Sequence, residues 1–140
     1  MKYSTRDFGE VEVTAERVLE FVQPILGYED RRLYTLLYDE KIGKKLIWLQ
    51  SLEEPELCFV LVDPTLLNRE YQPRISLKDC EQLGDGEYMC LPIAVIPGDL
   101  RKATVNLKSP IVINPDNRRA MQVVLQQDYP VRTALFEGAK

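Results

Sequence analysis

Residues 46–62 read LIWLQSLEEPELCFVLV, and this stretch decides the fold that we expect. Branched and aromatic side chains dominate residues 46–50 and residues 57–62, which favours two β-strands. Pro55 lies between them, where a proline ends a strand because it cannot donate to the ladder. Residues 57–62 are apolar throughout, which predicts a strand covered on both faces. We also expect Trp48 to be buried, so that its replacement by alanine would unfold the domain.

Short segments of similar chemistry recur on both sides of this stretch, separated by Pro, Gly, Asp and Asn. Further strands are predicted at residues 10–13, 32–38, 88–96, 111–113 and 121–125. The last two are expected to form a hairpin with a longer loop between them. Many short strands with little helix argue for an all-β barrel or sandwich. We therefore predict an all-β fold, a small β-barrel-like single domain over residues 1–140 with one or two short helices.

The helical signal is confined to one short segment. Ser76 resembles a capping residue, and Gly84 ends the pattern. Leu77, Cys80 and Leu83 recur at helical spacing between them. We expect one short helix that packs through this single stripe.

Composition and charge narrow the classes of function. The chain has 140 residues, a net charge of −4 and a pI near 5.0. Direct nucleic-acid binding is not expected, because each contact with a phosphate favours a cation. The polar start and the absence of an apolar run near the ~20 residues of a spanning helix predict a cytoplasmic protein without a membrane segment.

Catalysis and metal binding have few candidate residues. The chain has no histidine, which excludes histidine-based hydrolases and imidazole metal ligands. Cys58, Cys80 and Cys90 form no C-x-x-C pair and suit small buried side chains in a reducing compartment. We predict a protein that is not an enzyme and holds no cofactor and no metal.

The densest group of carboxylates is Glu53, Glu54 and Glu56 around Pro55. Consecutive glutamates in a polar turn favour a shared solvent-facing position. A carboxylate hydrolase would need Glu54 or Glu56 to be buried with a raised pKa.

A protein-binding surface is the remaining candidate. Residues 64–73 form an irregular stretch bracketed by prolines, in which Tyr71 has charged neighbours of the kind enriched at interfaces. We predict contacts through Glu70, Tyr71 and Gln72, together with the Glu53, Glu54 and Glu56 turn, to a basic partner steered by charge. The alternative is that Leu66 and Leu67 only plug the end of the barrel.

Two blocks of the sequence resemble the flagellar assembly factor FliW family. The first, within residues 49–64, contains Leu-Gln-Ser, Glu-Pro-Glu-Leu, Phe-Val and Asp-Pro. The second is more specific and reads TVNLKSPIVIN over residues 104–114, followed by Gln-Val-Val-Leu at 122–125 and by Tyr129. The resemblance runs from about residue 3 to about residue 132.

This resemblance implies a small cytoplasmic factor without catalytic activity. Members of the family bind the translational repressor CsrA and prevent it from silencing flagellin messages. They also bind flagellin as a chaperone-like partner, so that flagellin and CsrA exchange. The residues alone leave an alternative open, a small β-barrel that binds RNA or a small ligand.

Four signature residues are Asn106, Leu107, Pro110 and Asn114. We expect them to serve the fold more than a partner. Pro110 is predicted to start a strand, where its missing N–H has no cost. Asn106 and Asn114 are predicted to bond turn backbone through their side chains.

Overall fold

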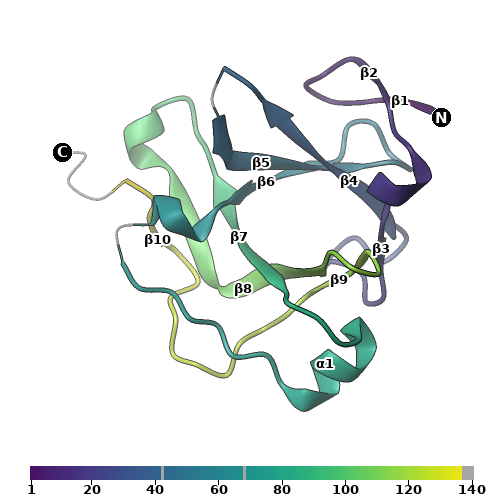
Figure 1. Cartoon of the computed structure of the whole chain (residues 1–140). Helices are drawn as coiled ribbons and strands as arrows, with labels where there is room; N and C mark the ends of the chain where they lie inside the picture. The colour runs from purple at the N-terminus through teal and green to yellow at the C-terminus, as the bar shows by residue number, and fades with distance from the viewer. Residues whose placement is uncertain (42, 68, 137–140) are drawn as a thin grey trace.

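The computed structural model describes residues 1–41, 43–67 and 69–136, and these residues form mainly β-strands (Figure 1). The strands are β1 (Lys2–Ser4), β2 (Glu10–Glu12), β3 (Leu19–Phe21), β4 (Leu33–Asp39), β5 (Gly43–Ser51), β6 (Cys58–Val62), β7 (Met89–Val95), β8 (Thr104–Asn114), β9 (Arg119–Gln122) and β10 (Thr133–Ala134). The helical elements described are α1 (Leu77–Leu83) and the 3-10 turns η1 (Ala15–Arg17), η2 (Pro64–Leu66) and η3 (Leu100–Lys102).

Strands β3 to β9 close into a barrel. Successive strands pair in antiparallel fashion, and β9 returns to pair with β3 in parallel, with Glu20 opposite Arg119. Strand β10 joins the first half of β8 outside this ring. Strands β1 and β2 form a separate hairpin above the barrel in Figure 1, while α1 lies below it. The predicted all-β, barrel-like fold is confirmed.

The predicted hairpin over residues 111–126 is present as β8, a turn and β9. However, β8 begins at Thr104, so the prediction that Pro110 starts a strand is wrong. The ladder between β7 and β8 is interrupted between Leu91 and Ile93, and residues 107–110 lie opposite this irregularity. Pro110 is tolerated inside a long strand because the bulge leaves no ladder partner for an N–H there.

Trp48 is half-buried and outside the barrel, so the prediction that it is a core residue is wrong. Alternation along β5 places Ile47 and Leu49 inside, where Leu49 is fully buried, and turns Trp48 to the outer face. Val60 on β6 is also half-buried. The prediction of a strand covered on both faces is therefore wrong at Val60.

Helix α1 has the predicted bounds. Ser76 Oγ accepts a hydrogen bond from the N–H of Asp79 at 3.2 Å, and Gly84 follows the last turn with φ of 82°, a region that favours glycine. Leu83 is buried in a small cluster outside the barrel with Val112, Met121, Val123 and Leu125. Leu77 is 84% exposed, so the predicted packing stripe is wrong at its first residue.

Burial makes the thiols of two of the three cysteines less acidic than a free thiol. Burial raises the pKa of the Cys58 thiol and of the Cys90 thiol from 9.0 to about 11. The folded state thus holds these protons more tightly than the unfolded state. The resulting stabilisation is complete below pH 9 and is lost as the pH rises toward 11.

We therefore expect both thiols to react slowly with iodoacetamide at pH 8 in the folded protein. A Cys80→Ser variant isolates them, and mass spectrometry with and without urea measures alkylation of each thiol. Labelling should be at least about tenfold slower in the folded state, because the thiolate is the nucleophile. Equal rates with and without urea would contradict the assigned burial.

Candidate functional site

The predicted acidic turn lies between β5 and β6. Two of the three carboxylates of this turn are bound by other residues of the chain. Glu53 Oε1 accepts hydrogen bonds from the N–H of Arg32 at 2.6 Å and from the N–H that follows it at 2.9 Å. Glu54 Oε2 pairs with Arg31 Nε at 3.2 Å. Glu56 is exposed, and no cation lies within ion-pair distance of it among the described residues. The turn presents less free negative charge than the sequence predicts.

The same turn lacks the burial that a catalytic acid needs. Glu56 is exposed, and the side chain of Glu54 is 45% exposed beside Arg31. A carboxyl group must be enclosed in apolar surroundings to remain protonated near neutral pH. The carboxylate-hydrolase hypothesis finds no support at these two residues.

The second predicted contact region, residues 70–72, has an exposed part and a packed part. Glu70 and Gln72 are exposed, and Gln72 Nε2 donates to Glu70 Oε1 at 2.6 Å. The Tyr71 hydroxyl instead donates to the carbonyl of Leu107 at 2.8 Å. Its ring meets the Tyr129 ring edge-on with centroids 4.9 Å apart, and burial raises its pKa. The side chain of Tyr71 therefore packs against the chain itself, and contact of residues 70–72 with a partner stays a prediction.

The two predicted contact regions do not form one surface. The Glu53–Glu56 turn lies at one side of the barrel, and residues 69–72 lie at the other (Figure 1). Leu66 and Leu67 are partly buried and pack against the cluster around Val62 and Leu107 outside the barrel, which is a structural role but not a plug at the barrel's end. Asn68 lies outside the described residues.

The signature block contacts the protein's own backbone. Asn106 Oδ1 accepts hydrogen bonds from the N–H groups of Lys108 and Ser109 at 2.9 Å and 3.0 Å. Leu107 is fully buried, and Pro110 is buried within β8. These contacts shape the bulge of β8, and any contact of this block with a partner stays a prediction.

Asn114 joins the end of β8 to the end of α1. Its Nδ2 donates to the carbonyls of Leu83 and Asp85 at 2.9 Å and 3.0 Å, and its Oδ1 accepts from the N–H of Asp116 at 3.0 Å. Asn117 Nδ2 donates to the same Leu83 carbonyl at 2.8 Å. The turn after β8 therefore satisfies carbonyl groups that the end of a helix leaves without partners.

One apolar hollow was not predicted from the sequence. It is a groove of about 970 Å³ on the outer face of β5 and β6. We name it the aromatic groove, and its lining includes Phe8, Tyr38, Leu46, Trp48, Val60 and Leu100. Phe8 reaches it from the loop of the N-terminal hairpin and meets Trp48 edge-on, with ring centroids 5.5 Å apart. Aromatic residues of this kind concentrate binding energy at protein interfaces.

Charged side chains form the rim of the aromatic groove. Arg6 and Asp7 pair at 2.8 Å and offset one another. The other charged residues of the rim are Asp39, Glu40 and Lys41. The rim therefore has a small excess of negative charge. An apolar segment of a partner that carries a cation beside it would match both the groove and its rim.

Comparison with known proteins places the chain in a family. Residues 2–135 match the family model described as FliW protein. The chain belongs to the FliW family. It is 35% identical to the flagellar assembly factor FliW of Ruminiclostridium cellulolyticum over 98% of this chain and 95% of that protein. The FliW protein of Natranaerobius thermophilus is 37% identical over 100% of this chain and 97% of its own.

A solved structure gives the same result at the level of fold. The crystal structure of a flagellar assembly factor FliW matches this FliW-family chain with a TM-score of 0.89 and 31% identity. The match covers 97% of each chain. Among the described residues, no helix is long and apolar enough to span a membrane.

A sequence signal for the aromatic groove exists in this FliW-family chain, but it is incomplete. Alternation places Leu46 and Trp48 on one face of β5, opposite Ile47 and Leu49. The groove on the outer face is completed by Phe8, which contacts Trp48 from the N-terminal hairpin. The local sequence pattern does not reveal that contact.

Proposed function

We propose that this protein is a cytoplasmic, non-catalytic flagellar assembly factor that binds the translational repressor CsrA and also binds flagellin. Binding would antagonise repression of flagellin messages by CsrA and would shield flagellin before assembly. Membership of the FliW family over nearly the whole chain is the observation that carries this proposal. The CsrA and flagellin roles come from the resemblance of the signature block.

The aromatic groove supports a chaperone-like role. A subunit that assembles into a filament must bury apolar surface against its neighbours, and that surface needs a cover beforehand. The groove offers partly exposed Trp48 and Leu100, the latter 52% exposed, in a hollow open to solvent. We assign the groove to an apolar segment of flagellin.

Exchange between the partners requires coupling of two binding equilibria. Flagellin displaces CsrA only if its binding lowers the affinity for CsrA, and the reverse then follows by linkage. Overlapping surfaces are the simplest way to couple them. We therefore assign CsrA to a surface that includes the acidic rim of the groove, near Asp39 and Glu40.

Salt should slow the association with CsrA. The chain carries a net charge of −4, and CsrA presents basic RNA-binding surface, so charge steers the encounter. Raising NaCl from about 50 mM to about 500 mM should lower the association rate at least about tenfold and change dissociation much less. Surface plasmon resonance measures both rates. Salt-independent association would show that apolar contacts dominate.

Co-purification tests the proposal as a whole. The tagged chain is mixed with its cognate CsrA, with flagellin, and with labelled RNA alone. The proposal expects complexes of micromolar affinity or better with both proteins. The absence of both complexes would remove it, and retention of RNA alone at physiological salt would favour the RNA-binding barrel.

A further inference from the structure

The edge of β9 is open beyond its contact with β3. The last hydrogen bond between them joins the N–H of Val22 to the carbonyl of Ala120 at 2.9 Å. Pro24 follows two residues later, has no N–H, and restricts the residue before it. The chain that would continue β3 therefore leaves. The N–H of Leu26 still donates to the side chain of Gln122 at 3.2 Å, but no described residue on that side forms a backbone hydrogen bond with residues 123–126.

The residues after β9 keep the geometry of a strand on their other side. The N–H groups of Val123 and Leu125 donate to the carbonyls of Pro110 and Lys108 at 3.0 Å and 2.8 Å. Strand β9 ends at Gln122 and the chain bends at Gln126, and between them the strand-like alternation turns the backbone groups of Val124 away from β8. No described residue forms a hydrogen bond with the N–H or carbonyl of Val124 or Gln126. This is a free strand edge.

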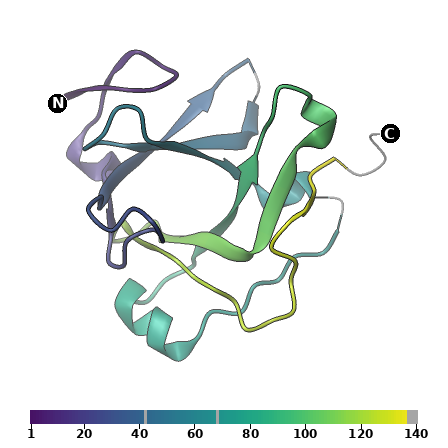
Figure 2. The same cartoon turned by 180° about the vertical axis from the view of Figure 1, so that it is seen from behind.

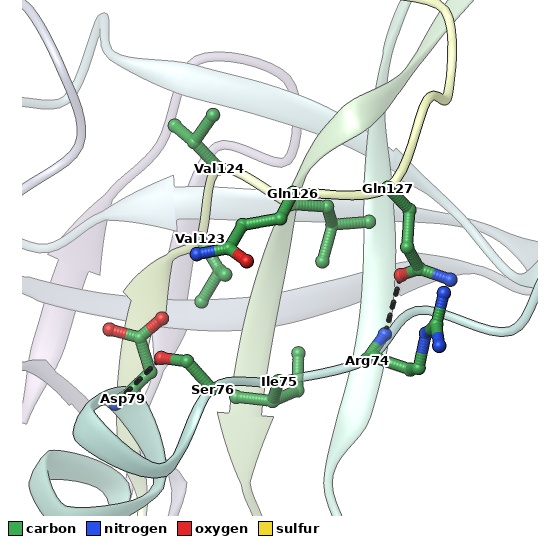
Figure 3. Close-up of a pocket in the computed structure, with 9 residues that line it drawn as sticks. Arg74, Ile75, Ser76, Asp79, Val123, Val124, Gln126 and Gln127 are labelled. Carbon is green, nitrogen blue, oxygen red and sulfur yellow. Dashed lines mark hydrogen bonds between the residues drawn. The ribbon is translucent and has the colours of Figure 1, made fainter.

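A groove runs along this edge, with α1 and the segment before it as the opposite wall. Two hollows of about 420 Å³ and about 500 Å³ share Asp79 and Val124 and together form what we name the edge groove. Figure 3 shows its first part, between residues 123–127 above and residues 74–76 below. Figure 2 shows from behind that both segments lie at the same end of the molecule as α1.

Exposed aliphatic side chains lie beside the edge groove. Val124 is 67% exposed and borders both parts, and Leu26 is 82% exposed at the far end. Leu77, at the start of α1, is 84% exposed next to the wall residue Lys78. Side chains of this kind on a free edge are the usual neighbours of another strand.

The chain already places an amide group at one end of the edge groove. Gln127 Oε1 accepts from the N–H of Arg74 at 2.7 Å, and Gln127 Nε2 donates to the carbonyl of Gln72 at 2.9 Å. Figure 3 shows Gln127 reaching across to Arg74. Residues 72–74 thus bind a carboxamide through one N–H and one carbonyl, as a strand binds its neighbour.

The charges of the edge groove are unpaired. Asp79, where the two parts meet, and Arg74, at the Gln127 end, form no ion pair with any described residue. An occupant with a cation near Asp79 and an anion near Arg74 would match them.

We propose that the edge groove binds an extended segment of a protein partner by addition of a β-strand to residues 122–126. The partner's backbone pairs with the free groups of Val124 and Gln126. Its alternate aliphatic side chains lie beside Val124 and Leu26, and its lysine or arginine meets Asp79. This mode supplies affinity through main-chain hydrogen bonds and specificity through alternate side chains. It is independent of the aromatic groove, because β5 and β6, which carry that groove, lie on the opposite side of the barrel from α1 (Figure 1).

A synthetic peptide tests the proposal on the full chain. The probe has about eight residues and blocked ends, with valine alternating with threonine, one central lysine and one glutamate near an end. NMR titration should show saturable binding with a Kd below about 1 mM. Amide exchange at Val124 and Gln126 should slow on binding. The same peptide methylated on alternate amide nitrogens should bind at least about tenfold more weakly, because it lacks the donors.

A proline scan provides a matched control. Val124→Pro removes the N–H of the edge and should weaken peptide binding at least about tenfold. Val131→Pro makes the same change at a valine that is 66% exposed outside the edge groove, and it should not weaken binding. No binding at 1 mM peptide, equal binding by the methylated peptide, or protection of amides elsewhere would overturn the proposal. The peptide and exchange results on the unaltered chain decide it if Val124→Pro fails to fold.

Discussion

Replacing Trp48 by alanine should weaken the binding of flagellin about thirtyfold or more while the protein stays folded. Trp48 is half-buried in the aromatic groove and packs edge-on against Phe8, so it has the position of an interface anchor. Loss of such an anchor costs about 2 kcal/mol or more of binding free energy, which is about thirtyfold in affinity. The free energy of unfolding should fall by only about 1 kcal/mol, because the ring lies outside the core.

Tyr28→Ala is the matched control for this variant. Tyr28 is 41% exposed and meets Phe59 edge-on at 5.3 Å, so the change removes a similar aromatic pair away from the groove. Isothermal titration with flagellin and thermal unfolding by circular dichroism give the two readouts. If Trp48→Ala binds flagellin as the unaltered chain does, the groove is not the contact surface. If it unfolds, Trp48 belongs to the core after all.

Replacing Asn114 by alanine should lower the free energy of unfolding by about 2–4 kcal/mol. Asn114 is fully buried and holds the carbonyls of Leu83 and Asp85 at the end of α1. The change removes three hydrogen bonds of a buried side chain, the two donor bonds and the bond accepted from the N–H of Asp116, each worth about 0.5–1.5 kcal/mol. Urea unfolding followed by circular dichroism measures the change.

Two further substitutions separate the hydrogen bonds of Asn114 from its shape. Asn114→Asp keeps the shape and the acceptor but loses both donor bonds, so it should destabilise at least as much as alanine. Asn117→Ala removes one bond to Leu83 and one bond accepted from the N–H of Arg119, both made by an exposed side chain, and should cost about 1 kcal/mol. A benign Asn114→Asp would show that the donor bonds do not matter.

Strands and turns were predictable because their causes are local. Period-2 alternation and proline placement gave most segments of the barrel, and Ser76 with Gly84 gave the bounds of α1. The bulge at Pro110 was not predictable, because it depends on the register of β7 against β8. Local pattern shows that a strand exists, whereas register is set by packing across the sheet.

The candidate sites are formed by contacts between segments that are distant in the sequence. They were therefore less predictable than the strands and turns. The carboxylates of the β5–β6 turn were predictable as a turn, but not the backbone N–H groups of residues 32 and 33 that bond Glu53, nor Arg31, which pairs with Glu54. Tyr71 has an interface-like sequence neighbourhood, yet its hydroxyl bonds Leu107, 36 residues away along the chain. The outer position of Trp48 is implicit in the alternation of β5, but Ile47 and Leu49 are as apolar as Trp48, so alternation alone does not show which face lies inside.

We propose that one surface of this protein exchanges CsrA for flagellin without any chemical reaction. The most direct measurement starts from the preformed complex with fluorescently labelled CsrA and adds flagellin, with anisotropy and size-exclusion chromatography as readouts. CsrA should be released as flagellin binds, with no complex that contains all three proteins, and Trp48→Ala should need about thirtyfold more flagellin for the same release. A stable three-component complex with unchanged affinity for CsrA would contradict it.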